Sequence, residues 1–329
     1  MHDQTSSSPS DVKRAPGGGV WIPSSLWIDR PDALRHIADR HSSGDISQEH
    51  AGLLRFFAEN GYCVFDTLVE EPLLDAVQED VDRLWRERPH DVAYAYDGPA
   101  KRLSSADEAR ERRTRYRLHD IHSHAESCLR LYLLPRVHEL VDLMFGEPSV
   151  AIQSLYFEYG SQQTLHRDAV VVPTDEPGHL VAAWIALEDI EPDSGALVYV
   201  PGSHLLPCFE TAPGEFMFDG RRMGGDVVER GLAFEAEQEK RCGLEPKVFA
   251  AKKGQVLIWH GALRHGGSPV LDESLTRKSF VVHFSTRRTY RDRSLIVSEE
   301  DGSPTELQTR QLVQNGQHAG FQNPMLGAD

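Results

Sequence analysis

The chain has only four cysteines among 329 residues, Cys63, Cys128, Cys208 and Cys242, and no two of them form a Cys-x-x-Cys pair. This scatter indicates neither a zinc knuckle nor a disulfide framework. We interpret the cysteines as free thiols and expect the protein in the reducing cytoplasm. Long hydrophobic runs are missing as well, which predicts no membrane span. The first twenty residues are polar, so we expect 1–20 to be a flexible leader rather than a signal peptide.

Basic residues are scarce relative to acidic ones. The chain has 35 Lys and Arg against 51 Asp and Glu, a formal net charge of −16. Such an excess argues against nucleic acid or an anionic membrane as the main partner, because both require a dominant basic surface. A small-molecule substrate remains compatible with it, since one or two local arginines can bind a small anion. The sequence leaves the oligomeric state open.

The N-terminal part shows helical periodicity. Apolar residues recur at helical spacing in 31–40, 47–60 and 71–88, and a short strand is expected at 62–65. Residues 90–116 are charged and aperiodic, which favours a solvated loop or a flap, and further helical pattern follows up to 145. We therefore expect 21–147 to be mainly helical.

At Pro148 the pattern changes to short β-rich runs separated by turn residues, at 150–159, 180–187, 196–200, 255–259 and 278–284. Such runs are typical of a double-sheet jelly roll of the cupin type. The predicted fold is mainly β, a double-stranded β-helix with the N-terminal helices packed on it. Within one domain over 21–329 we expect the jelly roll at 148–290, a lid insertion at about 205–253, and a C-terminal tail at 291–329.

The segment Gln-Thr-Leu-His-Arg-Asp at 163–168 contains the first candidate metal-binding residues. In an extended chain side chains i and i+2 point the same way, so His166 and Asp168 share a face while Arg167 points to the other. A histidine and a carboxylate held together can bind one metal ion. With a second histidine they would form the 2-His-1-carboxylate facial triad, which leaves positions open for a co-substrate and O2.

Two histidines are available to complete that triad, His260 and His265. Their odd separation means that on one continuous strand they would face opposite ways. His260 follows an apolar strand and could be an ordinary wall residue. His265 precedes Gly266 and Gly267, where the backbone can approach a ligand closely, and we favour it.

Arg277 follows His265 by twelve residues, at the entry to the last apolar strand. A guanidinium there could bind a carboxylate in a bidentate fork, although an arginine at a strand edge can equally be a surface residue. We interpret His119, His122 and His124 as surface residues, because their spacing is a poor helical ligand set. His204 is interpreted as a packed or hydrogen-bonding residue, and His283 as core or pocket lining.

Taken together and in order, these motifs resemble the phytanoyl-CoA dioxygenase family of Fe(II)/2-oxoglutarate-dependent oxygenases. The resemblance covers roughly 50–286. The matching segments are Gly-Tyr-Cys-Val at 61–64, Leu-His-Arg-Asp at 165–168, Ala-Trp-Ile-Ala-Leu-Glu-Asp at 183–189, Ser-Gly-Ala-Leu at 194–197, Pro-Gly-Ser-His at 201–204, and His-Gly-Gly-Ser at 265–268 with Arg277 downstream.

The resemblance implies a metal site and a co-substrate site. In it, His166, Asp168 and His265 hold Fe(II), and Arg277 binds the distal carboxylate of 2-oxoglutarate, with O2 as the oxidant. It further implies that Trp184 and Leu155 line the co-substrate pocket. Arg117 matches a basic family position that contacts 2-oxoglutarate. One departure is the Pro-Val-Leu at 269–271, where the family often has an asparagine.

The presence of Asp168 also separates the chain from related halogenases, which have a small residue at this position. The expected activity is a dioxygenase that hydroxylates a small metabolite or natural-product intermediate and releases succinate and CO2. An acyl-CoA substrate would need basic contacts for its phosphates. Two arginine groups could supply them: Arg110, Arg112, Arg113 and Arg115, or Arg287, Arg288, Arg291 and Arg293. Two other functions stay open, a non-catalytic cupin-like binding module and a redox-neutral, metal-dependent jelly-roll enzyme.

Overall fold

A computed structural model describes residues 26–95, 101–213, 215–217, 225–290 and 311–322. The predicted leader at 1–20 lies outside these residues. Three of the helices begin and end within two residues of their predicted bounds. The helices are α1 Ala33–Ser42, α2 Gln48–Asn60, α3 Glu71–Glu87, α4 Glu108–Glu111, α5 Glu126–Tyr132, α6 Pro135–Phe145 and α7 Gly225–Cys242.

Helix α2 shows how the local sequence sets these bounds. The hydroxyl of Ser47 accepts a hydrogen bond from the backbone N–H of His50 at 3.0 Å, which caps the first turn. Gly61 ends the helix in the left-handed region at φ 76°. A Cβ atom there would lie 2.5 Å from Nδ1 of His204, so glycine is required by both backbone and packing.

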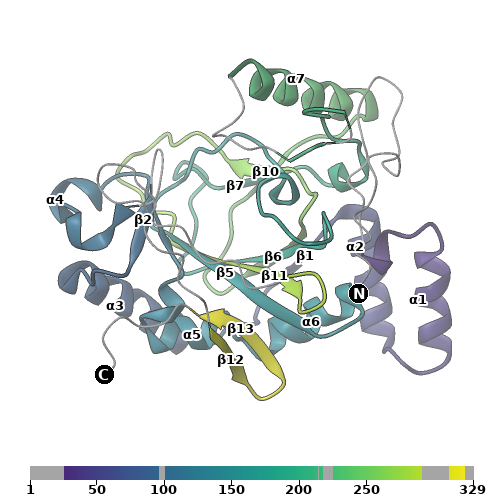
Figure 1. Cartoon of the computed structure of the whole chain (residues 1–329), viewed down its shortest axis with the longest axis horizontal. Coiled ribbons are helices and arrows are strands. Elements are labelled where there is room, and N and C mark those ends of the chain that lie inside the picture. The colour runs from purple at the N-terminus through teal and green to yellow at the C-terminus, as the bar shows by residue number, and fades with distance from the viewer. Residues whose placement is uncertain (1–25, 96–100, 214, 218–224, 291–310, 323–329) are drawn as a thin grey trace, which may run out of the picture.

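The strands form two sheets, as Figure 1 shows. The larger has ten strands in the order β1-β9-β6-β11-β5-β4-β2-β3, with β13 added beside β5 and β12 beside β13; the smaller has the order β10-β7-β8. The strands are β1 Tyr62–Phe65, β2 Ala93–Ala95, β3 Lys101–Arg102, β4 Arg117–His119, β5 Ser149–Phe157, β6 Val181–Ala186, β7 Leu197–Tyr199, β8 Lys247–Phe249, β9 Val256–His260, β10 His265–Gly267, β11 Ser279–Thr286, β12 Gln311–Asn315 and β13 His318–Gln322. The predicted fold, a mainly β jelly roll with N-terminal helices, is confirmed.

The central strands of the large sheet are buried on both faces, which explains their continuous apolar sequences. One face, with Ile185 and Phe280, packs on residues of α2, α3, α5 and α6. The other, with Trp184 and Val281, belongs to a separate core that includes Tyr199 of the small sheet. The space between the two sheets holds the candidate site.

Two predictions for the N-terminal part were wrong. Residues 90–116 are not simply a solvated loop, because β2 and β3 lie within the described part of this segment and Tyr94 is buried. Arg117–His119 is a strand rather than helix, and it pairs with both β2 and β5. A short strand gives too few residues for a periodicity to be read, and its structure comes from pairing with β5.

Residues 311–322, in the predicted C-terminal tail, form a hairpin whose strand β13 runs parallel to β5. The sequence analysis did not anticipate these strands. The larger division of the chain, at 147 and 290, stays a prediction. Cys63, Cys128 and Cys208 are buried thiols and Cys242 is an exposed one. None of the helices in the described ranges has the length and apolar character of a membrane span.

Candidate metal centre and co-substrate pocket

The imidazoles of His166 and His265 and the carboxylate of Asp168 converge on one point between the sheets. Nε2 of His166 lies 3.6 Å from Oδ1 of Asp168, and Nε2 of His265 lies 3.6 Å from Oδ2. One ligand atom from each of the three lies within 4.8 Å of the others. Reciprocal backbone hydrogen bonds of 2.9 and 3.0 Å join His166 to His265, so β10 brings the two histidines together although 98 residues lie between them in the sequence.

A backbone carbonyl oxygen next to Nδ1 fixes the ring orientation of each histidine. Nδ1 of His166 lies 2.9 Å from the carbonyl oxygen of Thr164, and Nδ1 of His265 lies 3.0 Å from that of Leu263. A carbonyl can only accept a hydrogen bond, so each Nδ1 carries the proton and each Nε2 carries a lone pair. Two Nε2 lone pairs directed at a carboxylate are the donor set that a divalent metal ion requires.

The electrostatics of His265 and Asp168 agree with this assignment. Burial lowers the pKa of His265 to about 4, which keeps its imidazole neutral. Burial alone would also lower the pKa of His166, but the hydrogen bond and charge of Asp168 raise it overall. For Asp168 burial would raise the pKa, yet His265, His283 and the hydrogen bond from His166 outweigh burial and hold it well below its usual range. Asp168 is therefore an anion at neutral pH.

Asp168 is held by two further groups. The indole N–H of Trp259 donates to Oδ2 at 2.9 Å, and Nε2 of His283 lies 3.3 Å from the same oxygen. The expectation that His283 is core or pocket lining is confirmed, since it is 3% exposed and faces the cavity. Carboxylates that bind metals are characteristically oriented by such outer hydrogen bonds.

Arg277 is 3% exposed and lies at the other end of the same cavity. Its guanidinium carbon is 5.2 Å from the ring of Phe157 and 6.0 Å from that of Trp184, and Nη1 donates to the hydroxyl of Ser279 at 3.0 Å. No carboxylate among the described residues pairs with it, and its Nε has no hydrogen-bond partner there. Burial lowers its pKa to about 10, so it remains a cation without an anion.

All seven site residues predicted from the sequence line one cavity of about 280 Å³. The reading of Arg277 as a surface residue is therefore excluded. The seven residues are Arg117, Leu155, His166, Asp168, Trp184, His265 and Arg277.

The register of the large sheet explains how these residues meet. Leu155, Val281 and Trp184 are paired across β5, β11 and β6, so their side chains share one face. Two positions along, Gln153 and His283 form the next row on that face.

His260, the alternative ligand, lies elsewhere. Its Nε2 is 2.9 Å from Oδ2 of Asp29, and its Nδ1 accepts from the backbone N–H of Ala262. Both ring nitrogens are thus occupied outside the cavity. The interpretation of His204 is also confirmed, because its Nε2 lies 3.1 Å from the carbonyl of Ala58.

The interpretation of His119, His122 and His124 as surface residues was wrong. His119 lines the cavity. His122 is buried, and its ring stacks on Tyr132 with centroids 3.7 Å apart. The side chain of His124 is nearly buried beside Asp91. Within the described residues these three histidines form no group able to hold a metal ion.

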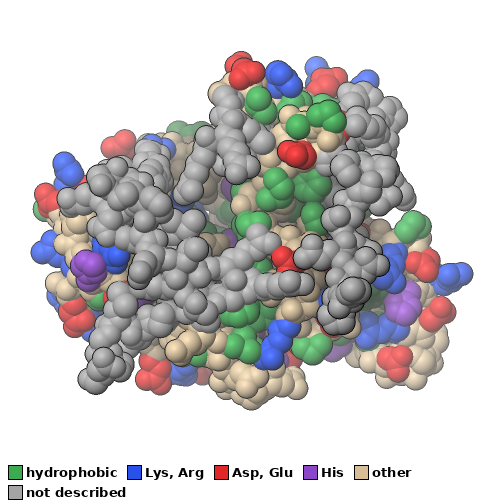
Figure 2. All heavy atoms as spheres, viewed as in Figure 1, with side chains coloured by type: hydrophobic (Ala, Val, Ile, Leu, Met, Phe, Trp, Pro, Cys, Tyr) green, Lys and Arg blue, Asp and Glu red, His purple; other side chains and the backbone are tan. Residues whose placement is uncertain are grey.

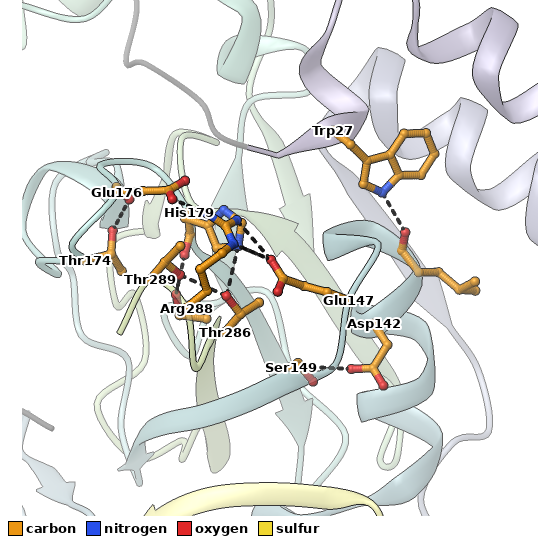
Figure 3. A network of polar contacts seen from close by, with 12 residues as sticks. Trp27, Asp142, Glu147, Ser149, Thr174, Glu176, His179, Thr286, Arg288 and Thr289 are labelled. Atoms are coloured by element: carbon orange, nitrogen blue, oxygen red, sulfur yellow. Dashed lines mark hydrogen bonds and ion pairs between the residues drawn. The ribbon is translucent and has the colours of Figure 1, made fainter. Parts of the chain in front are cut away.

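A polar network fixes the segment that follows Asp168. Figure 3 shows Glu147, Thr286 and Arg288 around the buried His179. Nη2 of Arg288 lies 2.9 Å from Oε1 of Glu147, and Nε2 of His179 lies 3.8 Å from the same oxygen. The carbonyl of His179 accepts a hydrogen bond of 2.7 Å from Ser285. The network ties the segment before β6, which includes the cavity-lining residues 171 and 172, to the end of β11.

Trp259, Gln153 and the cavity position of His119 were not predicted from the sequence. The sequence did hold a signal for Trp259. The residue lies on a predicted strand, two positions after Leu257, and both faces of that strand are buried in the sheet. Which face looks into the cavity depends on the register of β9 against β6, and that register cannot be read from the separate strands.

Comparison with known proteins agrees with this geometry. The family model described as phytanoyl-CoA dioxygenase matches residues 57–279. The peroxisomal phytanoyl-CoA dioxygenase of Mus musculus is 26% identical over 290 residues, which is 85% of this chain and 78% of that protein.

Two crystal structures share the fold. EctD from S. alaskensis with 2-oxoglutarate and 5-hydroxyectoine has a TM-score of 0.54 at 16% identity, covering 86% of each chain. The non-heme alpha ketoglutarate dependent carbocyclase SnoK from nogalamycin biosynthesis has a TM-score of 0.53 at 18% identity, covering 80% of this chain and 95% of that one. Since the family model matches more than half of its length, the chain belongs to the phytanoyl-CoA dioxygenase family and is an Fe- and 2-oxoglutarate-dependent oxygenase that uses O2.

Proposed function

We propose that the protein hydroxylates a small metabolite or natural-product intermediate, with conversion of 2-oxoglutarate to succinate and CO2. In this proposal His166, Asp168 and His265 hold Fe(II), and Arg277 binds the distal carboxylate of 2-oxoglutarate. The observation that carries it is the convergence of the three ligand groups with an unpaired, buried guanidinium in one cavity.

The donor set fits iron. Two imidazoles and one carboxylate are the ligands of non-heme Fe(II) oxygenases, and they leave coordination positions for other molecules. The tautomers fit as well, since the carbonyls of Thr164 and Leu263 leave both Nε2 atoms as acceptors toward the metal. No third histidine is required, because His283 lies against Asp168 as a hydrogen-bonding partner.

The cavity also fits 2-oxoglutarate. A buried cation without a counter-ion is costly, and a carboxylate of the co-substrate would neutralise Arg277 through a fork of hydrogen bonds. The indole N–H of Trp184 is likewise buried without a partner among the described residues. With Leu155 in the same row of the sheet, Trp184 would offer the co-substrate an apolar wall and one additional donor. We also assign Arg117 to this pocket, at its edge.

Iron with 2-oxoglutarate and O2 supplies the oxidising power for attack on a C–H bond. The chain's own residues bind, orient and shield. Asp168 stays anionic, Arg277 sets the direction of the co-substrate, and Phe157, Leu197 and Val281 line the cavity with apolar surface that excludes water. In a redox-neutral enzyme the buried Arg277 would have no co-substrate to bind.

The choice of a small substrate rests on the cavity and on the arginines. A cavity of about 280 Å³ lies at the small end for ligand sites. Of the arginines considered for the phosphates of an acyl-CoA, three pair with carboxylates of this chain: Arg112 with Asp82 and Glu158, Arg110 with Glu111, and Arg288 with Glu147 and Glu176. Arg291 and Arg293 lie outside the described residues.

EctD, a structure with the same fold, was crystallised with 5-hydroxyectoine, and SnoK is named a carbocyclase. Small substrates and more than one reaction outcome therefore occur on this fold. The four free thiols support a reducing compartment, and we place the protein in the cytoplasm.

The test is an anaerobic titration of the metal-free protein, first with Fe(II) and then with 2-oxoglutarate, followed by exposure to O2 and to a set of candidate small molecules. We expect binding of one Fe(II), binding of 2-oxoglutarate that depends on Fe(II), and succinate release that a true substrate accelerates. Tight metal binding with no use of 2-oxoglutarate in any mixture would instead favour the binding module.

A further inference from the structure

Two arginines adjoin the candidate iron ligands in sequence and turn away from the cavity. Arg167 stands between His166 and Asp168, and Arg264 directly precedes His265. Both are buried, at 2% and 3% exposed. Buried arginines need counter-charges, and both find them on one helix, α7.

Arg167 is bound from several sides. Its Nε and Nη2 donate to Oε2 of Glu235 at 3.1 and 2.6 Å. Its Nη1 also donates to the carbonyl oxygens of Leu206 at 3.2 Å and of Ala262 at 3.1 Å. Ala262 belongs to the segment that leads to His265, so an arginine from one ligand segment holds the backbone of the other.

Arg264 makes the reciprocal connection. Its Nη1 lies 3.1 Å from Oε1 of Glu239, and its Nη2 donates to the carbonyl oxygen of Leu165 at 3.2 Å. Leu165 directly precedes His166. The segments that carry His166 and His265 are therefore linked by two hydrogen bonds from an arginine side chain to a backbone carbonyl. Each of these arginines also pairs with a glutamate of α7.

The inner face of α7 is polar where a docked helix would ordinarily be apolar. Its buried residues are Gly231, Glu235 and Glu239, spaced one helical turn apart. In Figure 2 the outer side of α7 carries charged side chains of both signs, and there Glu237 pairs with Arg241 at 3.7 Å. The two arginines thus account for the polar contacts of the buried face of α7.

We propose that α7 is a brace for the metal centre rather than a freely moving lid, with Glu235 and Glu239 as positioning residues. The inference rests on the proposed function, because it takes His166, Asp168 and His265 as the iron ligands. Through Arg167 and Arg264, the glutamates fix the distance between the two ligand segments. They also cancel two positive charges next to a site that must accept a dication, and an uncancelled cation there would oppose metal binding.

Glu235→Gln tests this, with Glu237→Gln as the matched control, since Glu237 lies on the same helix and is exposed. The readouts are the dissociation constant of the metal-free protein for Fe(II) under anaerobic conditions, measured well below the melting temperature, and the melting temperature itself. Loss of a group that hydrogen-bonds a metal ligand directly weakens metal affinity about 10- to 100-fold. Because Glu235 acts one contact further out, through Arg167, we expect a loss of up to about tenfold for Glu235→Gln and no change for Glu237→Gln.

A purely structural role would lower the melting temperature of Glu235→Gln and leave the Fe(II) affinity of its folded form unchanged, which would overturn the proposal. Glu239→Gln is the second variant, because Arg264 makes the weaker pair, and we expect a smaller loss of affinity with the fold retained. Unchanged Fe(II) affinity in Glu239→Gln, if Glu235→Gln does not fold, would count equally against the brace. The wild-type protein separates the two hypotheses: failure to bind Fe(II) at all would refute the proposed function, not the brace alone.

Discussion

The indole N–H of Trp259 donates to Oδ2 of Asp168 at 2.9 Å, from a strand that begins 88 residues after the carboxylate. His283 approaches the same oxygen at 3.3 Å. Two donors on one oxygen fix the rotation of the carboxyl group and leave Oδ1 facing His166. The candidate metal centre is therefore organised by the large sheet as much as by the three proposed ligand residues.

Trp259→Phe keeps the aromatic packing and removes this donor. We expect about a tenfold weaker affinity for Fe(II), because Asp168 loses one of the groups that orient it. Calorimetric titration of the metal-free protein measures it. Trp184→Phe is the control, since Trp184 lines the same cavity without bonding to Asp168. Equal metal affinities in the two variants would show that the hydrogen bond from Trp259 does not matter.

Arg277→Gln removes the buried cation proposed to bind 2-oxoglutarate. Truncation of one partner of a buried, hydrogen-bonded charge pair costs about 2 kcal/mol or more, so the dissociation constant for 2-oxoglutarate should rise at least about thirtyfold. The affinity for Fe(II) should change little. The exposed Arg287 provides the control variant Arg287→Gln. A 2-oxoglutarate affinity that survives in Arg277→Gln would remove Arg277 from the co-substrate site.

Gly266→Ala tests the close approach of β10 to the segment before His166. A Cβ atom at Gly266 would lie 2.5 Å from the backbone oxygen of Gln163, so the two ligand segments would have to separate. We expect loss of metal binding and of succinate production. Gly52→Ala, on the exposed face of α2 where an added Cβ meets no atom within 4 Å, should be neutral or stabilising by up to about 1 kcal/mol. Normal turnover by Gly266→Ala would contradict this geometry.

The free energy of unfolding should decrease as the pH is lowered below about 6.5, partly because of His138. Burial lowers its pKa to about 3 in the native protein, whereas an unfolded chain takes up that proton near pH 6.5. Above pH 6.5 both states are neutral and the group contributes nothing. Between about 6.5 and 3 only the unfolded state is protonated, so the free energy of unfolding decreases as pH falls.

His138→Asn retains a polar group near the hydroxyl of Ser149, which lies 3.0 Å from Nδ1 of His138, and abolishes the titration. The slope of unfolding free energy against pH in this window should decrease by up to about 1.4 kcal/mol per pH unit. Urea unfolding at several pH values measures the slope. A slope identical to that of the wild type would show that His138 is already accessible to protons in the native state.

The sequence predicted the parts of this protein that depend on local pattern. Helices such as α2 and α3 follow from apolar periodicity and capping residues, and the pair His166 and Asp168 follows from the two-residue period of an extended chain. His265 was favoured because of the two glycines that follow it, whereas Arg277 could be singled out because a known family has the same motifs in the same order.

What the sequence could not provide depends on pairing between distant segments. His119 was assigned to the surface because its spacing from His122 and His124 is a poor helical ligand set, and only its register opposite Leu155 turns it into the cavity. The attachment of α7 depends on two glutamates that resemble any other charges of an exposed helix. Their role emerges only when Arg167 and Arg264 are seen on the opposite side of the ligand backbone.

The central claim, that Asp168 with His166 and His265 holds the iron that oxidises 2-oxoglutarate, is tested most directly by succinate release. The measurement compares wild type and Asp168→Ala, each supplied with Fe(II), 2-oxoglutarate and O2, with anaerobic samples alongside. The account predicts O2-dependent succinate from the wild type and none above background from the variant. Substantial succinate from Asp168→Ala, or succinate from the wild type without O2, would contradict it.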